Sequence, residues 1–338
     1  QIDSLVNKYV NNRWLIGSTV IVVKDNQVVY HKGFGYANEA SKKAMPSNAI
    51  YRIMSQTKAI TSLAIMQLYE QGKISLDQNV STIISSFKNP TVLKDFNEKD
   101  SSYTTIPAKK EFTIRELLTH TAGFSYPQIG SPMATAIYAK VGVSGGIGIE
   151  KQTLQENMQL LAKTPLFQQP GEQFLYGMNT DVLGYLVEKV SGISLDAFFR
   201  QRLFDPLGMK DTYFNIPAEK QNRLVTLYSQ YNDTLSRSPE STIINGTKID
   251  LYFPNKNFPM YSGGGGLSST IMDYAIFMQM MLNGGEYNGV RILSRNSVRM
   301  MTQNQIGELS NGVNKIGLAF GITSEIGSSL LPLNEGSF

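Results

Sequence analysis

Tyr51-Arg-Ile-Met-Ser55-Gln-Thr-Lys58 leads directly into the apolar segment Ala59-Ile-Thr-Ser-Leu63-Ala-Ile-Met66-Gln-Leu68-Tyr69, which ends at Gly72. This pattern predicts a long apolar helix that begins at Ser55. Ser55 and Lys58 are three residues apart on its first turn, so they share one face and lie close enough to exchange a proton. The positive end of the helix dipole and burial both disfavour an ammonium ion, which favours a neutral Lys58 amine that acts as a base. The stretch predicts a serine nucleophile activated by lysine, with an N-cap serine beside an exposed lysine as the structural alternative.

A second S-x-x-K match, Ser85-Ser-Phe-Lys88, lies in a less favourable context. Asn89-Pro90 follows it directly, and a proline there ends any helix. We expect Lys88 to be a solvated charge at the end of a short segment. Ser55 therefore remains the preferred candidate for the nucleophile.

The composition removes several competing chemistries. The 338 residues contain no Cys and two His, which excludes thiolate nucleophiles and Cys-ligated metal sites and disfavours a multi-His metal site. Lys and Arg (31) nearly balance Asp and Glu (27) without a basic run, so no nucleic-acid groove is indicated. No apolar stretch approaches the roughly 20 residues of a membrane span.

A His-dependent mechanism is the main alternative for a serine nucleophile. The G-x-S-x-G pattern of the α/β-hydrolases occurs once, at Gly142-Val-Ser144-Gly-Gly146, but that fold needs its His after the Ser, and no His follows His120. His120 falls at the end of a helix that the capping box Thr113-x-x-Glu116 predicts, where an imidazole meets unpaired carbonyl groups. His31 falls in a predicted strand. We therefore expect a loop at 142–146 and structural roles for both His residues.

Strand signals lie near both ends of the chain, and helix signals lie between them. Segments 19–23 and 27–30 predict a hairpin, and segment 317–322 predicts a late strand. Helices are predicted over much of 51–264, and the Pro/Asn-rich stretch at about 230–260 predicts a surface excursion. This order predicts an α/β (α+β) fold. Its antiparallel sheet would be formed by both chain ends and flanked by helices, with a large helical subdomain inserted between the ends.

Four further segments extend the pattern of the Ser55 helix. They are Phe112-Thr-Ile-Arg-Glu-Leu-Leu-Thr-His-Thr-Ala-Gly123, Pro170-Gly-Glu-Gln-Phe-Leu-Tyr176 with Asp181-Val-Leu-Gly184, Leu203-Phe-Asp-Pro-Leu-Gly-Met209, and the loop 263–267 with Asp273-Tyr274. Together with 51–60 they resemble the serine β-lactamase and penicillin-binding-protein superfamily. The resemblance lies on the side of the class C β-lactamases and the β-lactamase-like carboxylesterases, and it runs from about residue 14 to 322.

The resemblance implies a β-lactamase/transpeptidase-like fold in one domain, 1–338, with an α/β part at about 1–50 and 265–338 and a helical part at about 51–264. It implies that Ser55 is the acylated nucleophile, Lys58 its base, and Tyr176 a proton shuttle to the leaving group and for the deacylating water. Substrate contacts are implied for Asn179, Gly264 and Gly265. The oxyanion hole would use the Ser55 backbone N–H and one from a sheet-edge strand. The resemblance implies no metal or organic cofactor. It implies a periplasmic or secreted location.

Two departures from the family pattern bear on the substrate. The class C β-lactamases and carboxypeptidases carry Asn two residues after the Tyr, whereas this chain has Met178 there and Asn179 one residue later. Because that family Asn contacts the substrate amide, efficient β-lactam hydrolysis is not expected. The family's third motif, a Lys, His or Trp with Gly one or two places on, is missing after 317–322. His31-Lys-Gly33 matches H-x-G, but this match lies in the wrong strand. We expect the final strands to be missing from this sequence.

The sequence therefore predicts a serine hydrolase that forms an acyl-enzyme on Ser55 and hydrolyses an ester or amide of a small-molecule or peptide acyl donor. One alternative is a D-Ala-D-Ala-type peptidase or transpeptidase that acts on cell-wall peptides. Another is a non-catalytic binding module of the same fold. Neither a nucleic-acid partner nor a membrane span is predicted, and the oligomeric state stays open.

Overall fold

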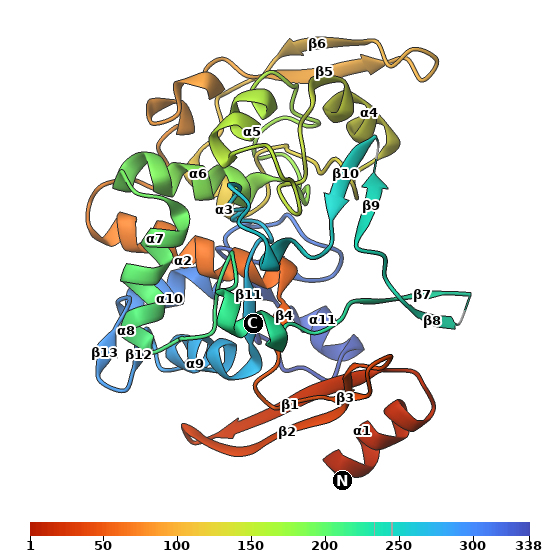
Figure 1. Cartoon of the computed structure of the whole chain (residues 1–338). Helices are drawn as coiled ribbons and strands as arrows, with labels where there is room; N and C mark the ends of the chain where they lie inside the picture. The colour runs from red at the N-terminus through yellow and green to blue at the C-terminus, as the bar shows by residue number, and fades with distance from the viewer. Residues whose placement is uncertain (233, 245) are drawn as a thin grey trace.

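The N-terminal segment forms a small antiparallel sheet at the bottom of the molecule in Figure 1. The computed structural model describes residues 1–232, 234–244 and 246–338. The first elements are α1 (Ile2–Asn11), β1 (Gly17–Lys24), β2 (Gln27–Asn38), β3 (Lys43–Ala44) and β4 (Ile50–Arg52). Strands β1 and β2 meet at a two-residue turn in which Asp25 and Asn26 both have positive φ, as the twist of a hairpin favours. The predicted hairpin is confirmed.

Helices dominate the middle of the chain. Its helices and strands are α2 (Thr57–Glu70), β5 (Thr91–Phe96), β6 (Tyr103–Pro107), α3 (Ile114–Leu118), α4 (Pro132–Val141), α5 (Leu154–Leu161), α6 (Asn179–Ser191), α7 (Leu195–Phe199) and α8 (Asp205–Leu207). Short 3-10 turns at Met54–Gln56, Val80–Thr82, Ser85–Phe87 and Ala218–Arg223 and a π-helical turn at Arg200–Phe204 join them. The predicted capping box is present, because Thr113 Oγ1 accepts the Glu116 backbone N–H at 3.2 Å while Glu116 accepts the Thr113 N–H at 2.9 Å.

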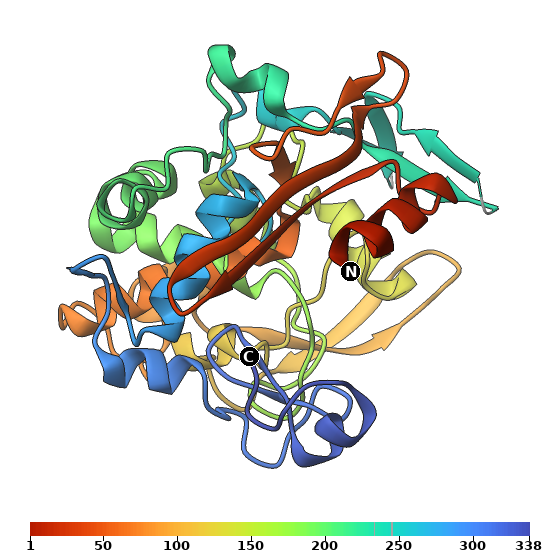
Figure 2. The same cartoon turned by 90° about the horizontal axis from the view of Figure 1, so that it is seen from below.

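The rest of the chain returns to the N-terminal sheet. Its elements are β7 (Tyr228–Tyr231), β8 (Thr234–Arg237), β9 (Ser241–Ile244), β10 (Thr247–Asp250), the 3-10 turn Phe253–Asn255, β11 (Ser268–Thr270), α9 (Ile271–Leu282), β12 (Glu286–Tyr287), β13 (Val290–Arg291), α10 (Arg295–Met301), β14 (Lys315–Ile316), β15 (Gly321–Ile322) and α11 (Glu325–Leu330). Strand β11 pairs with β4, and Ser268 lies opposite Arg52. Helix α9 packs on β1, and Figure 2 shows β1 and β2 lying across this helix.

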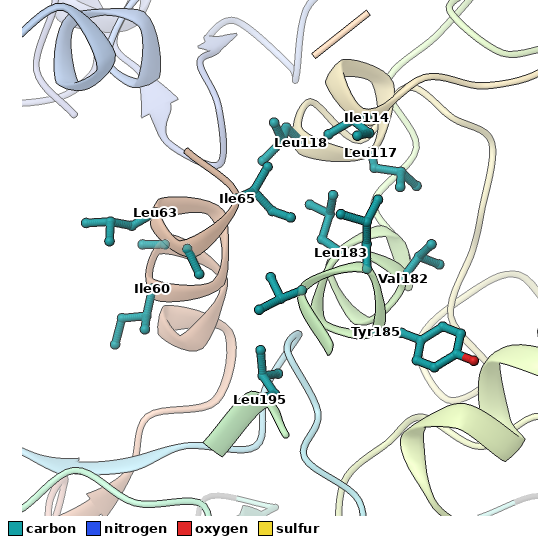
Figure 3. Close-up of a cluster of buried hydrophobic side chains, with 14 of the residues drawn as sticks. Ile60, Leu63, Ile65, Ile114, Leu117, Leu118, Val182, Leu183, Tyr185 and Leu195 are labelled. Atoms are coloured by element: carbon teal, nitrogen blue, oxygen red, sulfur yellow. The ribbon is translucent and has the colours of Figure 1, made fainter. Parts of the chain in front are cut away.

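Helix α2 is the centre of the hydrophobic core. Every residue from Thr57 to Leu68 is buried, including the polar residues Lys58 and Gln67. Figure 3 shows Ile65 of α2, Leu118 of α3 and Leu183 of α6 directed into the same interior space. Tight packing around α2 fixes its position, so the residues at its N-terminus are held by the core of the molecule.

One expectation about strands needs correction. Segment 317–322 is not a continuous strand, because Ala319 has φ +79° and the Gly317 N–H donates to Phe320 O, which makes a tight turn between β14 and β15. The C-terminal part does contribute an antiparallel strand, because β11 pairs with β4. It reaches the sheet of β1, β2 and β3 through α9. The mixture of helices and antiparallel strands agrees with the predicted α+β class.

Two remaining observations concern the surface of the molecule. The stretch at about 230–260 forms two hairpins, β7–β8 and β9–β10, so the predicted surface excursion has its own strands. Within the described ranges, none of the helices combines the length and the apolar character needed to cross a membrane.

Candidate active site

Ser55 lies at the exposed beginning of the buried helix α2. It belongs to the 3-10 turn Met54–Gln56, directly before Thr57. Met54 has φ +46°, a left-handed conformation that is strained for a residue with a long side chain and that recurs at functional sites. The Ile53 N–H donates to Leu267 O, which ties the turn to the segment before β11. The core therefore presents the Ser55 hydroxyl at the surface on a rigid support.

Lys58 lies one helical turn further along and is buried, with 5% of its surface exposed. Its Nζ donates to Ser55 Oγ at 3.2 Å and to the Gly264 carbonyl oxygen at 2.6 Å. The amine also lies over the rings of Tyr176 and Tyr126, 4.8 and 5.3 Å from their centroids. Ser55 and Lys58 are thus in direct contact, and the alternative of an exposed lysine does not agree with the structure.

Tyr176 comes to the same place from the segment before α6. Its hydroxyl and the Ser55 hydroxyl share a hydrogen bond of 2.6 Å. The Tyr176 side chain is 37% exposed, so one side of the ring faces solvent. The Leu175 N–H donates to the carbonyl of His120, which holds this segment against the end of α3. The three residues expected to carry the chemistry, Ser55, Lys58 and Tyr176, are therefore brought together.

His120 lies behind Tyr176, although the sequence indicated only a helix-end role. Its ring lies 4.9 Å from the Tyr176 ring, centroid to centroid. Nδ1 accepts from the Gly177 N–H at 3.4 Å and contacts Asn179 Nδ2 at 2.9 Å, so Nε2 carries the ring proton. Burial, together with the charge of Lys58, lowers the pKa of His120 to about 3. The imidazole is neutral and supports the tyrosine as a packing surface.

The three expected substrate contacts have other partners in the structure. Asn179 is fully buried, and its amide nitrogen lies 2.9 Å from His120 Nδ1. Gly264 and Gly265 are also buried, and the Gly264 carbonyl is occupied by Lys58. A Cβ on Gly264 would lie 2.5 Å from Asp181 Oδ2, and one on Gly265 would lie 2.5 Å from Ile147 Cδ1. These glycines permit close packing under the site.

Tyr126 is a second tyrosine at the site that the sequence analysis missed. Its ring lies 5.5 Å from the Tyr176 ring and beside the Lys58 amine. Burial raises the pKa of Tyr126 well above its usual value, and the nearby Asp181 and Tyr176 act in the same direction. Its phenol is therefore neutral. The only available signal was its place three residues after the Phe112–Gly123 segment, and one tyrosine among 17 does not stand out.

The remaining sequence candidates lie outside this cluster. Lys88 is exposed after the turn Ser85–Phe87, as expected. The Ser144 hydroxyl is buried and donates to Gln152 Oε1 at 2.6 Å in a loop after α4, so the expected loop is confirmed. His31 contacts the Ser47 carbonyl oxygen at 2.9 Å, in line with a structural role. In the part of the chain that the structure describes, no group of three or more His, Cys, Asp or Glu side chains is arranged to hold a metal ion.

Comparison with known sequences gives a consistent set of relatives. A family model described as Beta-lactamase matches residues 2–323. Protein Rv1367c of Mycobacterium tuberculosis is 29% identical over 319 residues, which cover 94% of this chain and 74% of the relative. A protein of Escherichia coli O157:H7 with the provisional name D-alanyl-D-alanine carboxypeptidase is 29% identical over 315 residues (85% and 64%). Esterase EstB of Burkholderia gladioli is 31% identical over 221 residues (65% and 52%). The chain spans less than two thirds of the last two relatives.

Comparison with solved structures supports the fold over almost the whole chain. EstCE1, described as a hydrolase with promiscuous acyltransferase activity, superposes with a TM-score of 0.82 at 25% identity and covers 99% of this chain and 85% of its own. An octameric penicillin-binding protein homologue from Pyrococcus abyssi superposes with a TM-score of 0.67 at 25% identity (95% and 64%).

Proposed function

Because the chain belongs to the beta-lactamase family and has a β-lactamase/transpeptidase-like fold, we propose that it is a serine hydrolase that forms an acyl-enzyme on Ser55. The observation that carries this proposal is the contact of one hydroxyl with two proton-handling groups. Ser55 Oγ lies 2.6 Å from the Tyr176 hydroxyl and 3.2 Å from Lys58 Nζ. Such a nucleophile with its base in hydrogen-bond reach is what acyl transfer requires.

In the acylation half-reaction, the neutral Lys58 amine takes the proton of Ser55 as Oγ attacks the carbonyl carbon of the substrate. A bond from Oγ to carbon forms, and the carbonyl electron pair moves onto oxygen. The backbone N–H of Ser55 would stabilise this oxyanion together with an N–H from a sheet-edge strand. When the intermediate collapses, the bond to the leaving group breaks, and the leaving group receives a proton through Tyr176.

In the deacylation half-reaction, water attacks the acyl carbon and gives its proton to Tyr176 and Lys58. Collapse of this second intermediate breaks the bond to Ser55 Oγ, which recovers a proton from the same pair. One water molecule is consumed, and the three side chains return to their starting state. The exposure of Ser55 and of one side of Tyr176 supports access of water to the acyl group.

Met178, two residues after Tyr176, favours an ester over an amide substrate. Met178 stands where the resemblance expects an amide-binding Asn, and its side chain is fully buried. Asn179 is turned toward His120, so neither residue offers a polar group to a substrate amide. The relative named esterase, EstB, is in line with this preference. A D-Ala-D-Ala-type peptidase is the second candidate, because another relative carries that provisional name.

The proposal is tested by the hydrolysis of a short-chain nitrophenyl ester and of a D-Ala-D-Ala peptide in parallel. We expect turnover of the ester to exceed that of the peptide and Ser55→Ala to abolish both. Ester hydrolysis by Ser55→Ala at the wild-type rate would reject the nucleophile. Turnover of the peptide alone would favour the peptidase. The family resemblance also supports a periplasmic or secreted location, which fractionation of the native cells would test.

A further inference from the structure

Asp181, in the first turn of α6, is a buried carboxyl group to which the mechanism above gives no part. Its Oδ1 accepts hydrogen bonds from Ser262 Oγ at 2.6 Å and from the Gly264 N–H at 3.1 Å. Its Oδ2 is buried without a hydrogen-bond partner among the described residues. A buried carboxyl group is costly unless hydrogen bonds or a nearby cation compensate it. The two hydrogen bonds compensate Oδ1, and the charge of Lys58 acts on the same carboxyl group.

Gly264 connects Asp181 to that cation. Its N–H points to the Asp181 carboxyl group, and its carbonyl oxygen accepts from Lys58 Nζ at 2.6 Å. Asp181 and Lys58 thus hold the same glycine from opposite sides. Any side chain at this position would meet Asp181 Oδ2 at 2.5 Å and the Tyr126 hydroxyl at 2.9 Å. A displacement of Gly264 would remove one of the two hydrogen bonds that orient the lysine amine.

Several titratable groups face the Lys58 amine, and they differ in charge. Tyr176 and Tyr126 present their rings, and Ser55 presents its hydroxyl. Burial raises the pKa of Tyr126 and lowers that of His120 to about 3, so both are neutral at neutral pH. Asp181 is the acidic group among them. Burial raises the pKa of Asp181, whereas the hydrogen bond from Ser262 and the charge of Lys58 act against this rise.

We propose that Asp181 is a positioning residue for this site. Through Gly264 it holds the Lys58 amine against Ser55, and its carboxyl group lies within electrostatic reach of this amine. The inference rests on the proposed function of Lys58 as the base. The acid limb of the pH–rate profile should then depend on a side chain that touches neither the substrate nor the nucleophile.

The test is the rate at which a fluorophosphonate labels Ser55, measured from about pH 5 to pH 10. In this reaction the bond from Oγ to phosphorus forms, the bond from phosphorus to fluoride breaks, and the serine proton passes to Lys58. Asp181→Asn keeps an oxygen that accepts from Ser262 and Gly264 but removes the charge. We expect the midpoint of the acid limb to move to lower pH by about one unit, since removing a nearby opposite charge favours the neutral amine. An unchanged midpoint would overturn the inference.

Two further variants keep the result decisive. Asp273→Asn is the matched control, because Asp273 is another buried carboxyl group, accepts from the Asp211 N–H at 2.7 Å and lies outside the site. Its midpoint should equal that of the wild type. Ser262→Ala removes one hydrogen bond that favours the ionised form of Asp181, so it should shift the midpoint in the same direction by less. If Asp181→Asn does not fold, an unshifted midpoint in Ser262→Ala overturns the inference.

A Ser55→Ala arm separates this inference from the proposed function. Undiminished labelling of Ser55→Ala would reject the proposed function itself. Loss of labelling in Ser55→Ala together with an unmoved midpoint in Asp181→Asn would reject the role of Asp181 alone.

Discussion

The contact between Tyr176 and Ser55 can be tested by removing one oxygen atom, the Tyr176 hydroxyl. Tyr176→Phe removes the 2.6 Å hydrogen bond and leaves the ring that packs on His120 and under the Lys58 amine. We expect the rate of acylation by a nitrophenyl ester to fall by about 100-fold or more, since general acid–base groups contribute on that order. Stopped-flow release of nitrophenol in a single turnover measures this rate.

Tyr274→Phe is the control for this change. The Tyr274 hydroxyl donates to the Gln56 carbonyl at 3.2 Å, next to the same turn but away from the Ser55 hydroxyl. Its loss should leave the acylation rate within a few-fold of the wild type. Equal rates for Tyr176→Phe and Tyr274→Phe would contradict the shuttle role.

His120 shows why residue type and local position were not enough to predict every group at the site. The sequence placed it at the end of a helix, and the structure does place it just after α3, with φ +56°. Its contact with Tyr176 depends on a segment more than 50 residues later, which no local pattern reveals. The contact between Ser55 and Lys58 was predictable because the two residues are only one helical turn apart, across the 3-10 turn and the start of α2.

At the scale of elements, the loop between Ser262 and Leu267 forms hydrogen bonds with both α2 and α6 under the site. We expect Gly264→Ala to displace this loop, because its Cβ would overlap the Asp181 carboxyl group. A shift of the Gly264 carbonyl misplaces the Lys58 amine, and a misplacement of about 1 Å can cost on the order of 100-fold in rate. Fluorophosphonate labelling at one pH measures the effect.

Gly321→Ala is the matched substitution for this test. A Cβ at Gly321 meets no atom within 4 Å, so neither folding nor labelling should change. Labelling of Gly264→Ala at the rate of Gly321→Ala would show that the loop does not position the lysine.

Elements with a local signal were predicted well, and elements that need distant partners were not. The capping box gave the start of α3, and the turn residues gave the β1–β2 hairpin. The strand predicted at 317–322 was wrong because these apolar residues form a turn. Another backbone lies close to this turn, since a Cβ on Gly317 would lie 2.1 Å from the Met301 carbonyl oxygen. An alternating or apolar run does not show whether another backbone approaches that closely.

For the whole molecule, the buried neutral His120 makes a prediction about acid stability. Its folded pKa, about 3, lies below the roughly 6.5 of an unfolded chain, so the unfolded state binds the proton first. The free energy of unfolding should therefore decrease as the pH falls from about 6.5 toward 3, by about 4 kcal/mol at pH 3 from this group. Urea unfolding at several pH values measures the decrease.

His120→Asn isolates the contribution of this imidazole. Asparagine tolerates the left-handed backbone at 120 and offers an oxygen where Nδ1 accepts, but it does not titrate. The variant should lose less stability than the wild type between about pH 6.5 and pH 3. Parallel decreases in the two proteins would show that His120 is not the buried titrating group.

The general architecture was predictable because several spaced motifs agreed with one family. One buried cluster includes residues from Ala59 to Leu318, and the single domain with boundaries at about 50 and 265 stays a prediction. The supporting groups of the site come from two separate segments: His120 and Tyr126 follow α3, and Asp181 belongs to α6. Their convergence is set by packing around α2, which the sequence does not display.

The central claim is that Ser55 carries the acyl group, and mass spectrometry of the labelled protein tests it most directly. The protein is quenched in acid after brief exposure to a nitrophenyl ester and is then digested and mapped. We predict that the mass of the acyl group appears on Ser55, that Tyr176→Phe slows its formation, and that Ser55→Ala shows no adduct. An adduct of equal yield on any other serine, or an unmodified Ser55 during rapid ester turnover, would contradict the account.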